Sequence, residues 1–126
     1  MKIIFGFIFG ILFMILFYKF NSNLFKRKII KTLIRQGARW SVAATQDKND
    51  MIGLLHANYG AGYLWALRDI FSDKDIEEIG GIDIIRFRDE IVNIQDEITK
   101  RVIKRCPEFG PESSYLTTLG GEGELV

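Results

Sequence analysis

The sequence predicts an all-α protein in which a single transmembrane helix precedes a small helical bundle of three longer helices and a short connector helix. Three observations predict this fold. A long apolar run without charge opens the chain, apolar residues recur at helical spacing through most of the remainder, and no segment shows the sustained alternation of a half-buried strand. The 126 residues leave room for one small domain. We expect an anchor at 1–20, a helical domain at 21–106 and a mostly irregular tail at 107–126.

The anchor is predicted from the residues that precede Asn21. The stretch Ile3–Tyr18 contains no charge, and twelve of its residues are Ile, Leu or Phe. Extended to Phe20, it makes a helix of roughly 27 Å, which is close to the thickness of the bilayer hydrocarbon. A cleaved signal peptide would have a shorter apolar region followed by small residues at a cleavage site, and no such site follows Tyr18. The pattern therefore favours an uncleaved signal-anchor that crosses the membrane once.

The charges predict how this anchor is oriented. Residues 1–46 contain eight Lys or Arg and no acid, whereas the rest of the chain carries a net charge of −7. Most of the eight bases follow the apolar run closely, and such bases stay on the cytoplasmic side of a membrane. We expect the N-terminus outside and the C-terminal domain in the cytoplasm, or inside a virion. The single cysteine cannot form an internal disulfide and agrees with a reducing compartment.

Two glycines inside the apolar run, Gly6 and Gly10, form a G-x-x-x-G pair. This spacing lets two membrane spans approach closely, so the pair is a candidate packing site between spans. Glycine is also common in membrane helices in general, which is the simpler interpretation.

The first helix of the soluble part is expected over 24–46, after polar residues 21–23 that interrupt the apolar run and offer a helix cap. Its apolar residues share one broad face, and four bases lie opposite. These bases form the basic stripe: Lys28, Lys31, Arg35 and Arg39. Next to a membrane, each base contributes about 1 kcal/mol of attraction to anionic lipid, so the stripe either binds the bilayer surface or only sets topology. Nucleic acid is not the expected partner, because no recognition motif and no interleaved exposed aromatics accompany the bases.

The second helix is expected over 51–71 and is mostly apolar. Small residues gather on one side of it, where another helix can pack closely, and Asn58, Gly62 and Asp69 lie on the side expected to meet water. The small residues are Gly53, Ala57, Gly60 and Ala61. Residues 51–67 carry no formal charge, but seventeen residues that include a histidine and an asparagine make a poor membrane span. We expect a buried central helix.

Ser72 and Asp75 form a plausible capping box for a short helix over 73–79, which Gly80 and Gly81 end. The third long helix is expected from Asp83 to about Cys106, before a proline stops it. Its apolar positions form a narrow seam with spacings of three and four: 84, 87, 91, 94, 98 and 102. In the tail, residues between Pro111 and Gly120 are the candidates for one further short helix.

The sequence contains few residues in patterns that are typical of a catalytic site. One histidine and one cysteine cannot make a zinc site, and no phosphate-binding or nucleophile motif is present, so we expect no catalytic residue, metal or cofactor. His56, Tyr59 and Tyr63 share a helix face and either line a small polar pocket or sit in the core with their polar ends at its edge; the second interpretation is favoured.

These observations lead us to expect a non-enzymatic, single-pass membrane protein that acts as a structural or protein-interaction module. Its expected partners are the lipid bilayer and another protein or itself. The alternatives are a structural component of a membrane-containing virus particle, a membrane-tethered accessory subunit of an enzyme complex, and a small enzyme that uses His56.

Overall fold

A computed structural model describes residues 2–109 of the chain. In order along the sequence, these form α1 (Lys2–Gln46), α2 (Asp50–Ile70), α3 (Asp73–Gly80), α4 (Ile84–Arg105) and the short 3-10 helix η1 (Pro107–Phe109). The described residues contain helices and no strand, which confirms the all-α prediction. The short helix predicted between Pro111 and Gly120 lies outside the described residues.

The long helix α1 differs from the prediction. The sequence analysis placed a break at 21–23, but α1 runs without interruption from the apolar run through the basic segment. Asparagine and serine cost less than about 0.7 kcal/mol each in a helix interior, far less than proline, and strong helix formers flank them on both sides. The predicted anchor and the predicted first helix of the bundle are therefore one rod. No break in the backbone marks the predicted boundary between 1–20 and 21–106.

The other helix ends follow local signals that the sequence carries. The Asn49 side chain accepts hydrogen bonds from the backbone N–H groups of Met51 and Ile52, which caps α2. Ser72 and Asp83 cap α3 and α4 in the same way. Gly81 ends α3 in the left-handed conformation, with φ of 68°, as a glycine readily does.

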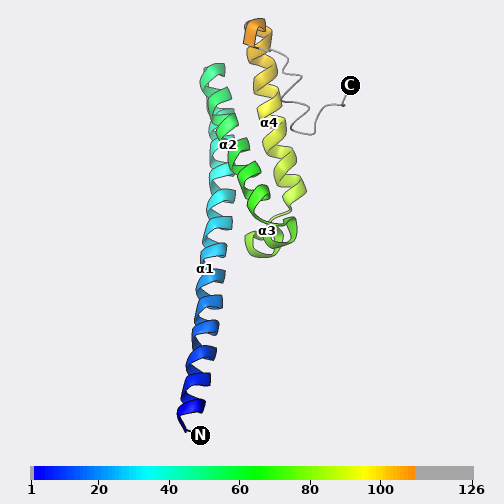
Figure 1. The fold of residues 1–126 in the computed structure, drawn as a ribbon. Coiled ribbons are helices and arrows are strands. Elements are labelled where there is room, and N and C mark those ends of the chain that lie inside the picture. Colours follow the sequence, from blue (N-terminus) through cyan, green and yellow to red (C-terminus); the bar gives the residue numbers. More distant parts are fainter. Residues whose placement is uncertain (1, 110–126) are drawn as a thin grey trace, which may run out of the picture.

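The helices form an up-down-up bundle on the second half of α1, while the first half projects alone (Figure 1). α2 returns antiparallel along α1, α3 turns the chain at the end of the bundle nearest the projecting half, and α4 runs back beside α2 (Figure 1). Close approach of α1 and α2 depends on glycine. A Cβ on Gly60 would collide with the hydroxyl of Ser41 and lie 3.2 Å from the carbonyl oxygen of Gly37.

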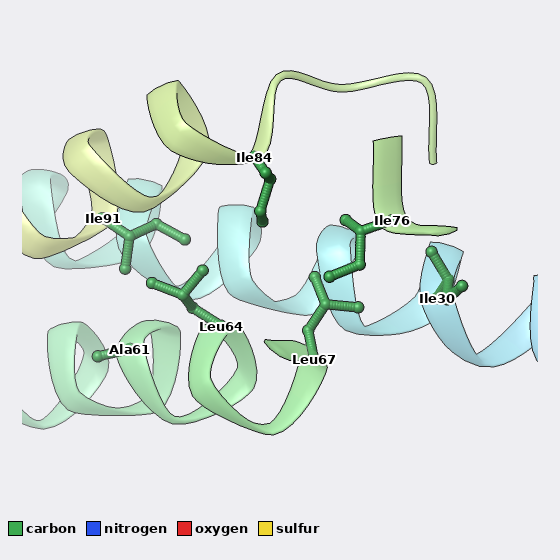
Figure 2. Close-up of a cluster of buried hydrophobic side chains, with 7 residues drawn as sticks. All are labelled: Ile30, Ala61, Leu64, Leu67, Ile76, Ile84 and Ile91. Atoms are coloured by element: carbon green, nitrogen blue, oxygen red, sulfur yellow. The ribbon is translucent and has the colours of Figure 1, made fainter. Parts of the chain in front are cut away.

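The core lies where the four helices meet, beside the second half of α1 (Figure 2). It is a cluster of buried side chains with one or more from each helix: Ile30, Ala61, Leu64, Leu67, Ile76, Ile84 and Ile91. A second, smaller cluster of Ala44, Ala57 and Ile98 continues it toward the far end. The predicted α4 seam supplies four of the buried side chains: Ile84, Ile91, Ile98 and Val102. The core therefore covers only the part of α1 that follows the apolar run.

Candidate functional site

No other described helix packs against the projecting half of α1. Every residue from Ile4 to Phe25 is exposed. As far as Phe20, Lys19 is the one charged residue, and the large apolar side chains expose from 42% to 75% of their surface. This distinguishes α1 from the core helix of a soluble protein, whose apolar residues would be buried. α1 is the one helix among the described residues that is long and apolar enough to cross a membrane.

Gly6 and Gly10 lie on this projecting half with open space around them. A Cβ built on either residue meets no atom of residues 2–109 within 4 Å. At about 100° per residue, both glycines fall on the same side of α1 as the basic stripe and away from Gly37 and Ser41, which face α2. A contact through these glycines would therefore form on the side of α1 opposite the bundle.

The bundle begins where the apolar half ends, with no linker between them. The ammonium of Lys26 lies 2.8 Å from the Asp75 carboxylate, which fixes α3 against α1 six residues beyond Phe20. Hydrogen bonds from Lys26 and from Ser72 hold the pKa of Asp75 below its usual value. α3 therefore stands at the edge of the apolar rod.

The basic stripe is exposed, and the described part of the chain offers it no acidic partner. Within residues 2–109 none of its four side chains forms an ion pair, whereas Lys26, Arg68 and several bases of α4 do. Because α1 is straight through this region, the stripe extends along the rod, and Arg39 lies about 17 Å farther from the apolar half than Lys28. Arg39 also stands 5.7 Å from the centre of the Trp40 ring, as a cation–π pair.

α2 packs one side into the bundle and leaves the other uncovered. The small residues Gly53, Ala57, Gly60 and Ala61 are all buried on the packed side. A Cβ on Gly53 would lie 3.3 Å from the carbonyl oxygen of Ala44, so α1 passes close to α2 at a second point.

The uncovered side of α2 is more apolar than the sequence analysis expected. Asn58, Gly62 and Asp69 are exposed in the single chain, as expected for this side of the helix. Large apolar side chains surround them, each 45–61% exposed: Met51, Ile52, Leu55, Tyr59, Trp65 and Ile70. We call these six residues, with Asn58 and Gly62, the outer face of α2. The uncharged stretch 51–67 predicts a buried central helix, but α2 is buried on one side only, because the bundle supplies neighbours for that side alone among the described residues.

The structure brings His56 and Tyr59 together with two residues that the sequence analysis did not select, Trp40 and Asp47. His56 Nδ1 lies 2.7 Å from an oxygen of Asp47, and the Trp40 ring lies 5.0 Å from His56 and 5.3 Å from Tyr59. Tyr63 is half-buried one turn farther along and takes no part in these ring contacts. The histidine thus ties α2 to the connection that follows α1, in the manner of a structural residue whose polar end has found a partner.

The far end of the bundle carries charges and the single cysteine. Asp50 at the start of α2 pairs with Arg101 at 3.3 Å and with Arg105 at 3.0 Å, which joins α2 to the end of α4. Half-buried Cys106 lines an open hollow of about 400 Å³ next to these groups. In the described residues, no three side chains of the histidine, cysteine or carboxylate type are grouped so that they could hold a metal ion.

Comparisons with protein-family models, with curated proteins and with solved structures found no match. The function is therefore inferred from the surfaces of the molecule itself.

Proposed function

We propose that this protein is a non-enzymatic, single-pass membrane protein that holds a small helical module at the bilayer surface for contact with other proteins. The observation that carries the proposal is the division of α1. Its first half exposes apolar side chains on all sides, and its second half is part of the core of the bundle. Apolar surface of this extent around a whole helix is stable in lipid and costly in water.

The continuity of α1 supports a fixed distance between the bundle and the membrane. With the span ending at Phe20, Lys26 and α3 stand about 9 Å beyond the hydrocarbon, at the level of the lipid headgroups. Lys19 at the end of the span can reach the same layer with its ammonium. The bundle would stand directly on the bilayer with little freedom to tilt away.

This arrangement favours a topological role for the basic stripe over lipid binding along its length. Lys28 would stand about 12 Å beyond the hydrocarbon and Arg39 about 28 Å. Attraction to a charged surface falls off within a Debye length, about 8 Å at physiological ionic strength. Only the bases nearest the membrane would be attracted strongly to anionic lipid. All four bases would favour retention of the bundle in the cytoplasm.

The test uses the native cysteine as a reporter of both insertion and orientation. The chain is expressed in bacterial membranes, extracted with alkaline carbonate, and labelled at Cys106 with a maleimide that does not cross membranes. We expect the chain to remain in the membrane pellet, and Cys106 to react in inverted vesicles but not in intact spheroplasts. Release by carbonate would contradict the anchor, and labelling from the outside would contradict the orientation. A Cys106→Ser variant controls for labelling at other groups.

A further inference from the structure

The eight residues of the outer face of α2 carry no charge, whereas the exposed sides of α1 in the bundle and of α4 carry several charges. Residues 51–67 carry no formal charge, and the large side chains of the outer face are about half exposed. The exposed side of α1 in the bundle is basic, and the exposed side of α4 carries residues such as Asp89, Asp96 and Lys100. An exposed surface that is apolar and uncharged is suited to contact with another apolar surface.

Gly62 stands near the middle of this face and has no packing role among the residues that the structure describes. A Cβ built on it meets nothing within 4 Å, whereas Gly53 and Gly60 of the same helix both lie against α1. A glycine inside a helix lowers its stability relative to alanine, so a glycine in open space is unfavourable for the isolated fold. The absent side chain would instead let a helix from outside the chain approach the α2 backbone closely.

We propose that the outer face of α2 binds the same face of a second copy of this chain, with the two α2 helices parallel and close together at Gly62. The parallel arrangement rests on the proposed function, because two copies anchored in one bilayer with the same orientation are related by an axis along the membrane normal. Charge selects this face for self-association. From Met51 to Trp65 this face carries no charge and meets its own copy without repulsion, while two basic stripes would repel each other.

The rod-like α1 separates this contact from the one predicted at Gly6 and Gly10. Those glycines face away from α2, on the side of the basic stripe. A two-fold pair built on them with nearly parallel helices would place the stripes of both copies face to face. A pair built on α2 leaves the stripes on the outside of the dimer. One symmetric dimer therefore cannot use both surfaces, and electrostatics favours α2.

The size of the face fits a dimer that depends on the membrane. Six large side chains at about half exposure present on the order of 500 Å² per copy, or about 1,000 Å² in the pair, which is near the lower limit for a specific interface. Confinement of both copies to one bilayer raises their effective concentration. Asp69 lies at the end of the face nearest the membrane and would meet its own copy there, so we expect the pair to be closest between Leu55 and Gly62.

The experiment is cysteine cross-linking of the full chain in liposomes at low protein density. In a Cys106→Ser background, single cysteines are placed on the outer face (Leu55→Cys, Gly62→Cys), on the outer side of α4 (Asn93→Cys), on the basic stripe (Arg35→Cys) and in the span (Gly6→Cys). A mild oxidant then joins copies whose cysteines are close. We expect the two outer-face variants to give at least about fivefold more disulfide dimer than Asn93→Cys or Arg35→Cys, as a parallel pair requires.

A second variant pair tests whether the contact holds the dimer together. Leu55→Lys, a change at a half-exposed position that leaves the core intact, should lower cross-linking at Gly62→Cys by about tenfold or more, because it places like charges opposite each other. Asn93→Lys, which adds the same charge on α4, should leave the cross-linking at Gly62→Cys unaltered.

The outcomes separate this proposal from the proposed function. Dimers formed at Gly6→Cys but not at Gly62→Cys would overturn the α2 contact in favour of the span. Equal, low cross-linking at Gly62→Cys and Asn93→Cys would also overturn it, as expected if another protein or residues 110–126 cover the face. Release of the chain from the same liposomes by carbonate would refute the anchor, whichever cysteines had reacted.

Discussion

At the scale of single residues, the glycines of α2 divide into those that the fold requires and one that it does not. Gly60 lies where α2 crosses α1, against Ser41 and the Gly37 carbonyl, and Gly62 faces open space two residues later. The helix period already separates the two, because it places Gly60 with the other small residues and Gly62 on the side of Asn58 and Asp69. The position of α1 then shows that Gly60 lies where the two helices cross.

This difference gives a matched pair of substitutions. Gly60→Ala should lower the free energy of unfolding by about 1–3 kcal/mol, because the added methyl group forces the backbones of α1 and α2 apart. Gly62→Ala should raise it by up to about 1 kcal/mol through helix propensity. Denaturant unfolding of the detergent-solubilised chain, followed by circular dichroism under dilute conditions where it is monomeric, measures both. Similar effects of the two substitutions on the free energy of unfolding would contradict the position of Gly60 at the crossing of α1 and α2.

The ion pair at the junction of α1 and α3 predicts a dependence of stability on pH. Lys26 and Ser72 lower the pKa of Asp75 in the folded chain. A carboxyl with a lowered folded pKa stabilises the fold at pH above its unfolded pKa of about 3.9, and that contribution is lost as the pH falls through the folded pKa. We expect the stability of the Lys26→Met variant to fall less steeply than that of the wild type on acidification below about pH 4.

Thermal unfolding midpoints at a series of pH values test this expectation. Lys28→Met is the matched control, because Lys28 is exposed and has no acidic partner among residues 2–109. A Lys26→Met profile parallel to that of the wild type would show that the ion pair contributes nothing to the acid dependence.

At the scale of the helices, local signals predict the structure well. The cap at Ser72 and the seam of α4 depend on side chains within a few residues of one another, and the structure confirms them. The predicted break at 21–23 was wrong because short polar residues are compatible with two structures. They cap a new helix or remain inside a longer one, and the residues on both sides decide between these.

The continuity of α1 is directly measurable. Spin labels on cysteines placed at Phe13 and Val42, both exposed, should give one narrow distance distribution, with the backbones about 43 Å apart. The labels are introduced in the Cys106→Ser chain, and pulsed electron resonance in liposomes gives the distance. Ser22→Pro should broaden the distribution, because proline removes a hydrogen bond and kinks the helix. A short or broad distribution in the chain without proline would indicate a hinge at 21–23.

At the scale of the whole molecule, the continuous helix α1 determines which surfaces are available for contact. It directs the basic stripe and the outer face of α2 to different sides of the bundle and places α3 beside the apolar half. With the span in a bilayer, the outer face of α2 would point sideways, toward neighbours in the same membrane. That geometry favours lateral association over contact with a distant partner.

The sequence by itself determined that the chain is helical, where α2, α3 and α4 begin, and that the first helix carries an uncharged apolar half followed by a basic one. These properties depend on residue composition and on the helical period of 3.6 residues per turn, both of which are local features of the sequence. Only the tertiary structure decided that α1 is unbroken, that Trp40 and Asp47 contact His56, and that large apolar side chains such as Leu55 and Trp65 stay exposed on α2. The reason is physical: a helix period shows which residues share a face, but the packing of distant helices decides which faces become buried.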